Sequence, residues 1–254
     1  MEPDPFRLAG RVALVTGGNG GLGLAIARGL AAAGARVWVT GRDERKNAAV
    51  ASRDGLGALV CDVRDEAAVA RTVGTVVESA GRLDVLVNNA GNYVAGPVLE
   101  LTEDDWRAVL DTHLTGSFLC AKHAARAMVA QGSGKIINIG SIYALFGQPA
   151  SVSYTTAKTG MVGLTRSLAV ELAAHGVQVN ALLPGWYDTE LTRGARETEW
   201  GERIRHKTPA QRWGEPIDLV GPAVFLASSA SDFVTGVALP VDGGYAVADR
   251  WLPE

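Results

Sequence analysis

The stretch TGGNGGLG, from Thr16 to Gly23, decides how the rest of the chain is interpreted. It follows the short apolar run 12–15 and leads into residues 22–33, which are rich in Ala and Leu, lack proline and therefore predict a helix. Glycines at such a junction let the backbone approach a ligand closely, and the helix N-terminus offers free N–H groups to a phosphate. The stretch predicts a phosphate-binding turn, although a tight strand-to-helix turn without a ligand has the same appearance.

On both sides of this turn, apolar runs alternate with helical patterns. Further strands are expected at 37–40, 59–61, 85–87, 136–139, 177–183 and 237–241, and further helices at 65–80, 106–129, 154–174 and 217–227. Several of the strands are continuously apolar, which is typical of strands buried on both faces of a parallel sheet. Repeated βα units with short turns predict one α/β domain over residues 1–254, built as a doubly wound parallel sheet with helices on both faces.

The segment 190–213 interrupts this alternation. It is polar and charged, with residues that include Arg193, Arg196, Arg203, Arg205, Glu197, Glu199 and Glu202. A segment this long between a strand and the next helix is often a lid or a binding loop, so we expect a substrate lid here. Its mixed charges favour a solvated helix face over a site for an acidic substrate.

Composition excludes several classes of protein. The chain has 254 residues, 47% of them hydrophobic and 20% charged, with a formal net charge of -3, so neither nucleic acid nor an anionic membrane is expected as a partner. Cys61 and Cys120 lack CxxC spacing, which favours buried free thiols over a disulfide or a metal site. The first residues lack signal-peptide character, and no run of about 18 apolar residues occurs, so a cytoplasmic protein is expected.

Tyr154 and Lys158 are spaced to share one face of a predicted helix. A nearby ammonium group favours the phenolate, so the pKa of the tyrosine is expected to fall from about 10 toward neutrality and allow proton transfer. Ser141 follows the apolar run 136–139, which places it at the edge where open α/β sheets bind ligands. Its hydroxyl could stabilise charge on a reacting oxygen. By itself, however, a Tyr–Lys pair at this spacing is common on ordinary helices.

The order of these motifs along the chain is more specific than any one of them. The set comprises TGxxxGxG at Gly17, Gly21 and Gly23, Asp62-Val63, NNAG at 88–91, Ser141 thirteen residues before Tyr154, YxxxK, PGxxxT at 184–189 and Asp242-Gly243-Gly244. This set resembles the short-chain dehydrogenase/reductase family over nearly the whole chain. The resemblance implies a Rossmann-like fold and an NAD(P)(H)-dependent oxidoreductase that transfers a hydride between the nicotinamide and a secondary alcohol or ketone. Tyr154 would be the general acid and base, supported by Lys158 and Ser141.

The resemblance also assigns residues to the cofactor. These are Gly17, Asn19, Gly21, Leu22, Gly23, Arg42, Asp62, Val63, Asn89, Ala90, Gly91, Tyr154, Lys158, Pro184, Gly185, Tyr187 and Thr189. Gly41 stands where NAD-specific members carry Asp, and Arg42 stands where many NADP-specific members carry Arg, which favours NADP(H) over NAD(H). NAD(H) stays open because the glycine turn holds no basic residue and Asp43 could compete for Arg42.

His113, in DTHLTGSF, is one departure from the family pattern. Members usually carry Asn at this position and are understood to use its backbone carbonyl to hold a water that connects the lysine to solvent, a role that tolerates another side chain. Two interpretations of His113 are open: a fourth catalytic residue that joins the proton relay, or a hydrogen-bonded packing residue.

The substrate is the least defined part of this interpretation. Ser141, Tyr143, Gln148 and Trp186 are expected to contact it, with Phe146 and Tyr187 nearby. This mixture suits a polar cyclic or polyol-like molecule as well as an apolar ketone, and the resemblance leans toward sugar or polyol dehydrogenases and 3-oxoacyl reductases. The competing function is a catalytically weak cofactor-binding or regulatory protein of the same fold; epimerases and dehydratases of this fold are usually longer. A homotetramer or dimer is expected through the helices 106–129 and 154–174, with Trp251 as a further contact.

Overall fold

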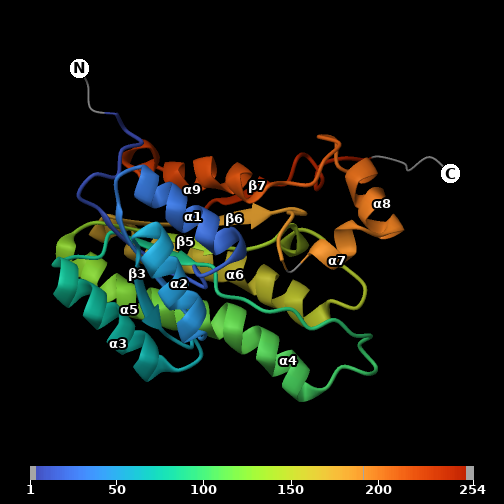
Figure 1. Cartoon of the computed structure of the whole chain (residues 1–254), viewed down its shortest axis with the longest axis horizontal. Helices are drawn as coiled ribbons and strands as arrows, with labels where there is room; N and C mark the ends of the chain where they lie inside the picture. Colours follow the sequence, from blue (N-terminus) through green and yellow to red (C-terminus); the bar gives the residue numbers. More distant parts are fainter. Residues whose placement is uncertain (1–3, 191, 250–254) are drawn as a thin grey trace.

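A single seven-stranded sheet organises the computed structural model, which describes residues 4–190 and 192–249 (Figure 1). The strands are β1 (Val12–Thr16), β2 (Arg36–Gly41), β3 (Gly57–Val60), β4 (Val85–Asn88), β5 (Gly134–Ile139), β6 (Val177–Pro184) and β7 (Ala238–Val241). They lie in the order β3-β2-β1-β4-β5-β6-β7, and all neighbouring pairs are parallel. The order reverses between β1 and β4, where a parallel sheet opens a crevice at its carboxyl edge.

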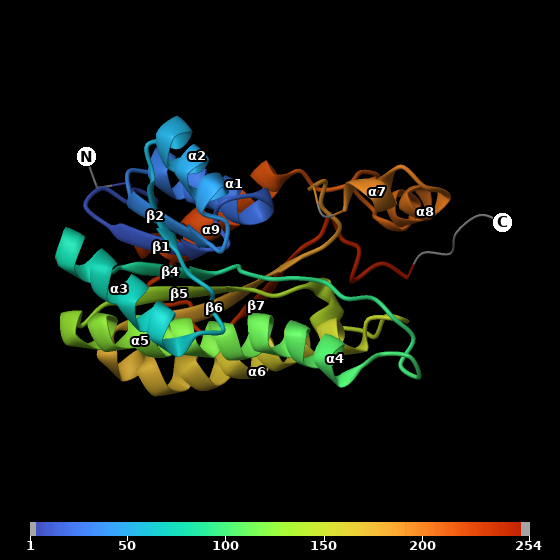
Figure 2. The ribbon, with the colours of Figure 1, turned by 60° about the horizontal axis from the view of Figure 1, so that its bottom comes forward.

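Helices cover both faces of the sheet, as the alternating pattern predicts (Figure 2). They are α1 (Gly21–Ala32), α2 (Glu44–Asp54), α3 (Glu66–Ala80), α4 (Glu103–Leu110), α5 (Gly116–Gln131), α6 (Val152–Leu172), α7 (Arg193–Arg196), α8 (Glu199–Lys207) and α9 (Val220–Ala227). Helices α1, α2 and α9 pack on one face, where Ile26 and Leu226 are buried, and α3, α5 and α6 pack on the other, where Val73 and Leu119 are buried. The doubly wound α/β prediction is therefore confirmed.

The predicted helix 106–129 differs in detail. The structure divides it into α4, a π-helical turn at Asp111–Thr115, and α5. A π turn holds one more residue than an α turn, so it changes which side chains face inward. His113 lies in this turn and is only 3% exposed.

Helix α2 was not predicted, and its composition explains why. Within it only Asn47 and Val50 are buried, so it lacks the apolar stripe by which a helix is usually identified. Its ends are nevertheless well defined. Asp43 caps it by accepting a hydrogen bond from the Lys46 backbone N–H, and Gly55 ends it in the left-handed conformation.

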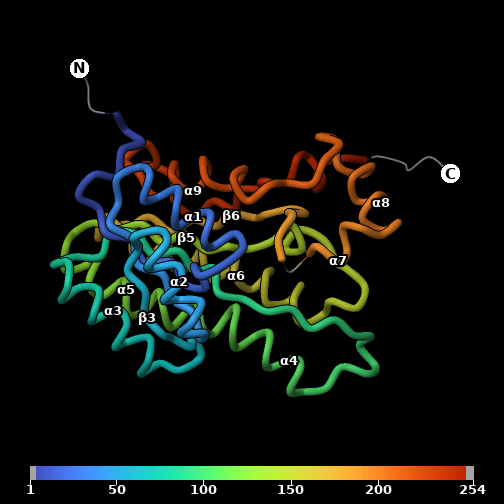
Figure 3. Tube along the Cα trace, in the orientation of Figure 1, coloured from blue at the N-terminus to red at the C-terminus, as the bar shows by residue number. Residues whose placement is uncertain are grey.

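The segment 190–213, which is expected to form a lid, contains α7 and α8. Leu191 of this segment lies outside the described residues. Both helices project beyond the carboxyl ends of the strands, at the same end of the molecule as the long loop that follows β4 (Figures 2 and 3). On α8, Arg203 pairs with Glu199 and Arg205 with Glu202, all on a solvent-facing surface. Helix α8 is anchored from beneath because the Trp213 indole donates to the Gly201 carbonyl at 3.1 Å.

The structure also bears on the cysteines, on membrane-spanning helices and on the predicted contact through Trp251. Cys61 and Cys120 are buried free thiols, as predicted. In the part of the chain that the structure describes, no helix is long and apolar enough to span a bilayer. Trp251 lies outside that part.

Candidate active site

The glycine turn between β1 and α1 forms the base of a groove at the crevice. Gly17 adopts φ +61°, and a Cβ there would lie 2.9 Å from the Ala90 Cα, so a larger residue would push β1 and the loop after β4 apart. A Cβ on Gly23 would lie 2.3 Å from the Asn89 amide nitrogen. Helix α1 has no side-chain cap and no acidic residue in its first turn, which leaves its N-terminal N–H groups for an anion. The turn fits the pyrophosphate of a dinucleotide.

Thr16 and Asn89 join the loops that follow β1 and β4. The Thr16 hydroxyl accepts hydrogen bonds from the backbone N–H groups of Asn89 and Ala90 at 3.0 and 3.1 Å. The Asn89 amide in turn donates to the carbonyl oxygens of Thr16 and Gly17, both at 3.0 Å. Because these bonds cross the point where the strand order reverses, they fix the two sides of the crevice relative to each other.

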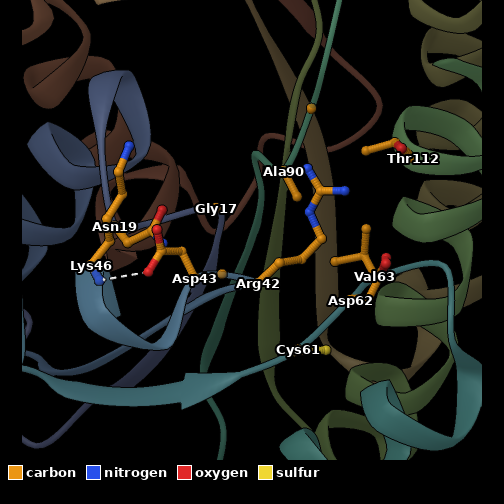
Figure 4. Close-up of a pocket in the computed structure, with 12 residues that line it drawn as sticks. Gly17, Asn19, Arg42, Asp43, Lys46, Cys61, Asp62, Val63, Ala90 and Thr112 are labelled. Carbon is orange, nitrogen blue, oxygen red and sulfur yellow. Dashed lines mark hydrogen bonds between the residues drawn. The ribbon is translucent and has the colours of Figure 1, made fainter. Parts of the chain in front are cut away.

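One end of the groove is a cavity of about 270 Å³ that fits an adenosine (Figure 4). Its described lining residues are Gly17, Asn19, Gly41, Arg42, Asp43, Lys46, Cys61, Asp62, Val63, Ala90, Gly91 and Thr112. Arg42 extends across the cavity toward Ala90, whereas Asp43 faces the start of α2 and accepts from the Lys46 N–H. No ion pair or hydrogen bond joins Arg42 to another described side chain, so Asp43 does not compete for it. The Asp62 carboxylate is held by Arg64, whose hydrogen bond lowers the pKa of Asp62.

The cavity continues into a larger cleft of about 680 Å³. The four residues predicted to be catalytic, Ser141, Tyr154, Lys158 and His113, all line it. So do the four residues predicted to hold the nicotinamide, Pro184, Gly185, Tyr187 and Thr189, together with Asn89 and Gly91, which were predicted to lie beside the adenine ribose. Of the predicted cofactor residues, Gly23 alone lines neither cavity within the described chain; it packs beneath the turn against Asn89.

Tyr154 and Lys158 project from the first turns of α6. The Lys158 ammonium is buried, donates to the Ile139 carbonyl at 2.7 Å, and lies 5.4 Å from the centre of the Tyr154 ring. Burial lowers the pKa of Lys158 to about 7. Burial raises the pKa of Tyr154 to about 12, an effect that the Ser141 hydroxyl opposes. The expected fall of the tyrosine pKa is therefore not seen, because the lysine donates to a backbone carbonyl rather than to the phenol and desolvation dominates.

His113 lies directly against Tyr154. The two rings are perpendicular with their centres 5.3 Å apart, and His113 Nε2 lies 2.7 Å from the Asn92 carbonyl oxygen. Burial lowers the pKa of His113 to about 3, so the ring is neutral at physiological pH. Its Nδ1 is buried and has no hydrogen-bond partner among residues 4–190 and 192–249. These contacts fit the interpretation of His113 as a packing residue. If His113 also takes part in a proton relay, it does so as a neutral imidazole.

A third cavity, of about 260 Å³, adjoins Tyr154 and is lined on one side by segment 190–213. The predicted substrate residues Ser141, Tyr143, Gln148 and Trp186 all line it. Phe146 instead packs behind Tyr143 at 5.8 Å, and Tyr187 faces the cofactor cleft and donates to the Val241 carbonyl.

Sequence reasoning missed several lining residues. In the third cavity these are Tyr93, Ile142, Thr192, Ala195 and Trp200, and in the cofactor cleft they include Lys46, Asn92 and Glu190. Tyr93 and Asn92 could have been found, because they directly follow the NNAG motif. Lys46 lies on α2, a helix that the sequence pattern does not predict. Trp200 lies on α8, and the sequence does not indicate which face of this helix points toward the cavity.

The cofactor cleft and the third cavity meet at Tyr154 and Ser141, so a cofactor in the cleft and a small molecule in the third cavity would approach the same hydroxyl groups. Tyr154 can exchange a proton there, and Ser141 can hydrogen-bond the reacting oxygen. Among the described residues, no group of three His, Cys, Asp or Glu side chains is placed to hold a metal ion.

Known proteins resemble this chain over nearly its full length. A family model described as enoyl-(acyl carrier protein) reductase matches residues 17–246. Gluconate 5-dehydrogenase of Gluconobacter oxydans is 40% identical over 97% of this chain and 99% of its own length. 5-Keto-D-gluconate 5-reductase of Escherichia coli is 39% identical over 96% and 99%. The solved structure of a gluconate 5-dehydrogenase from Burkholderia cenocepacia, in complex with NADP and tartrate, is 41% identical with a TM-score of 0.93, covering 96% of this chain and 98% of that one.

Proposed function

Because this chain belongs to the short-chain dehydrogenase/reductase family, we propose that it interconverts a secondary alcohol and a ketone with NADP(H), using Tyr154 as acid and base. It is an NAD(P)(H)-dependent oxidoreductase that acts on CH–OH groups. The observation that carries the assignment of residues is that Ser141 and Tyr154 line both the cofactor cleft and the cavity beneath the lid.

In the reductive direction, the cleft lined by Tyr154, Gly185 and Tyr187 would hold the nicotinamide, whose reduced form would supply a hydride for the carbonyl carbon. Tyr154 gives the phenolic proton to the carbonyl oxygen, so the ketone gains one hydride and one proton and becomes a secondary alcohol. Ser141 hydrogen-bonds the same oxygen and stabilises its developing charge. Lys158, whose pKa is about 7, can hold a positive charge near the phenolate that Tyr154 leaves behind, which favours that state. His113 supports the Tyr154 ring.

The proposed choice of NADP(H) rests on two cations in the adenosine cavity. Arg42 has no partner among the described side chains, and Lys46 lines the same cavity as well as the adjoining cleft. A 2′-phosphate carries negative charge that a guanidinium can bind through two hydrogen bonds. The Burkholderia relative was solved with NADP, which agrees with this choice.

The alternative, a catalytically weak regulatory protein, has no observation in its favour. Ser141, Tyr154 and Lys158 are all present and line one cleft, and the relatives are named as dehydrogenases and reductases. The names of these relatives also make gluconate and 5-keto-gluconate the first compounds to assay.

The test is a panel of secondary alcohols and ketones assayed with NADP(H) and with NAD(H), following the absorbance of the reduced nicotinamide. We expect turnover of at least one ketone, with kcat/KM higher with NADPH than with NADH. Turnover only with NADH would refute the cofactor assignment. No turnover of any compound, together with tight NADPH binding, would favour the regulatory alternative.

Segment 190–213 is proposed to be the lid over this site. Glu190 at its start approaches the Lys46 ammonium of α2 to 4.0 Å, and both residues line the cofactor cleft. Closure of the segment would therefore cover bound cofactor as well as substrate.

We also propose a homotetramer or a dimer that pairs α5 and α6. Phe118 on α5 is 45% exposed and Val170 on α6 is 83% exposed, and such apolar side chains are typical of an interface. The mass of the protein in solution tests this, and a monomer would exclude it. The cytoplasm is the proposed location, because two free thiols and a reduced cofactor both suit a reducing compartment.

A further inference from the structure

Five aromatic side chains form most of the wall of the cavity beneath the lid. We call Tyr93, Tyr143, Tyr154, Trp186 and Trp200 the aromatic box. Successive rings meet edge to face: Tyr93 and Tyr154 at 5.3 Å, Tyr143 and Tyr154 at 5.9 Å, Tyr143 and Trp186 at 5.9 Å, and Trp186 and Trp200 at 4.7 Å between centres. This is a favourable geometry for aromatic pairs, so the rings hold one another in place around the space next to the reacting hydroxyl.

The described wall of this cavity contains no charged side chain. Besides the box, its lining residues are Ser141, Ile142, Gln148, Gly185, Thr192 and Ala195. Three nearby cations are engaged elsewhere: Arg196 pairs with Asp188, the Lys207 ammonium lies over the Tyr245 and Phe146 rings at 4.2 and 5.5 Å, and the Lys158 ammonium donates to the Ile139 carbonyl in the adjoining cleft. Arg193 follows the lining residue Thr192 but does not itself line the cavity. A carboxylate buried in the box would lose its hydration without gaining a cation, which is strongly unfavourable.

The box nevertheless has a few polar groups available. The Gln148 side chain makes no hydrogen bond within the described residues, and the buried Trp186 indole N–H has no acceptor there. Buried polar groups are normally hydrogen-bonded, so the Trp186 N–H is suited to an oxygen of a ligand, and the half-buried Gln148 amide is available to a second polar group. The volume of about 260 Å³ equals roughly nine water molecules at about 30 Å³ each, which is ample room for a single substituted ring.

We propose that the aromatic box binds an uncharged, single-ring alcohol or ketone, rather than a sugar acid such as those for which the relatives are named. The ring packs between the aromatic side chains, with its carbonyl at Tyr154 and Ser141 and a polar substituent at Gln148. This inference rests on the proposed hydride transfer, and it assigns a substrate class to that site.

A matched pair of ketones tests the inference. 4-Methylcyclohexanone and 4-oxocyclohexanecarboxylate share the ring and the carbonyl and differ in one charge. With NADPH we expect kcat/KM to be at least about tenfold higher for the neutral ketone, and 5-keto-D-gluconate to be poorer still. Equal or better use of either carboxylate would overturn the substrate class while leaving the proposed ketone reduction intact.

A binding measurement covers the case in which neither cyclohexanone is turned over. Trp186 and Trp200 line the box, so a ring that packs against them should change the tryptophan fluorescence of the enzyme–NADP⁺ complex. We expect a saturable change with 4-methylcyclohexanone and a much weaker response with the carboxylate. No response to either ketone, or a stronger response to the carboxylate, would overturn the inference.

A charge placed in the box provides a reciprocal test. Gln148→Arg should shift the ratio of kcat/KM values toward 4-oxocyclohexanecarboxylate by at least about tenfold, whereas Gln148→Met, similar in length but uncharged, should keep the preference for the neutral ketone. Thr192→Lys introduces a cation elsewhere in the wall, in case Gln148→Arg does not fold. Two folded cationic variants that both keep the wild-type preference would show that the substrate does not occupy the box.

Discussion

The cofactor groove and the aromatic box are adjacent but are built from different parts of the chain. The groove is formed largely by backbone at the carboxyl ends of β1 and β4, joined by the Thr16 and Asn89 hydrogen bonds. The box is formed by side chains from loops, from the start of α6 and from α8. Backbone that must approach a ligand tolerates few residue types, whereas many side chains can fill a wall. The difference explains why the cofactor can be predicted from the sequence and the substrate cannot.

Tyr154 belongs to both regions, so the largest effect is expected there. Tyr154→Phe should reduce kcat by about 10²- to 10⁴-fold, because it removes the transferable proton. NADPH affinity should change little, since the ring keeps its contacts with His113 and Tyr93. Steady-state rates and NADPH titration measure the two effects. Tyr93→Phe is the matched control, because it loses a hydroxyl that bonds Ser151 but not the transferred proton. A wild-type rate for Tyr154→Phe would contradict the mechanism.

The next largest effect is expected at His113, which packs against Tyr154 where the groove and the box meet. Its folded-state pKa of about 3 lies below the ordinary 6.5, so the unfolded chain binds the extra proton between these values. The part of the free energy of unfolding that depends on a neutral His113 is therefore fully present above pH 6.5 and is lost as the pH falls toward 3. Between pH 7 and pH 4, the free energy of unfolding of wild type should fall by about 3 kcal/mol more than that of His113→Asn. Denaturant unfolding at several pH values measures this, and equal slopes for both proteins would argue against a buried neutral ring.

Arg42 tests the groove alone. Arg42→Ala should reduce the preference for NADPH over NADH by about 10- to 100-fold, since charge-assisted hydrogen bonds contribute about 1.5–3 kcal/mol. Turnover with NADH should stay near that of wild type. Arg45→Ala is a suitable control because Arg45 is exposed, lies three residues after Arg42 at the start of α2, and does not line the cavity. If both variants behaved alike, the preference would arise from general positive charge and not from a site.

Trp200 tests the box alone and should give the smallest effect. Trp200→Ala removes one edge-to-face partner of Trp186, which contributes about 1 kcal/mol. We expect KM for the ketone to rise by about three- to tenfold, with NADPH affinity unchanged. Phe233→Ala, at a fully exposed position, should leave both constants unchanged. A change in NADPH affinity for Trp200→Ala would show that lid and groove are coupled.

The sheet, its helical layers and most of the groove follow from patterns that physical chemistry constrains strongly. The central strands β1, β4 and β5 are buried throughout, as expected for the centre of a parallel sheet, although β5 also buries the polar side chains of Lys135 and Asn138. Helix α2 was missed because tertiary contacts and its caps, not an apolar stripe, define it. The pKa of Tyr154 was mispredicted because spacing indicates that Lys158 is near but not where its ammonium points. The set of aromatic residues that lines the third cavity depends on how α8 packs against the rest of the molecule. A local sequence pattern does not determine this packing.

The π turn at Asp111–Thr115 amounts to a single-residue insertion in an otherwise continuous helix. Each residue of an α-helix advances about 100° around the axis, and the wider π turn takes up its extra residue with almost no additional rotation. Removing one residue here would therefore restore a regular α-helix and keep α4 and α5 in the same relative phase. What would change is the turn itself, where His113 would no longer be held against the Tyr154 ring. A one-residue deletion in this segment is therefore predicted to leave the fold intact and to disturb the support of Tyr154, an effect that alanine scanning would not produce.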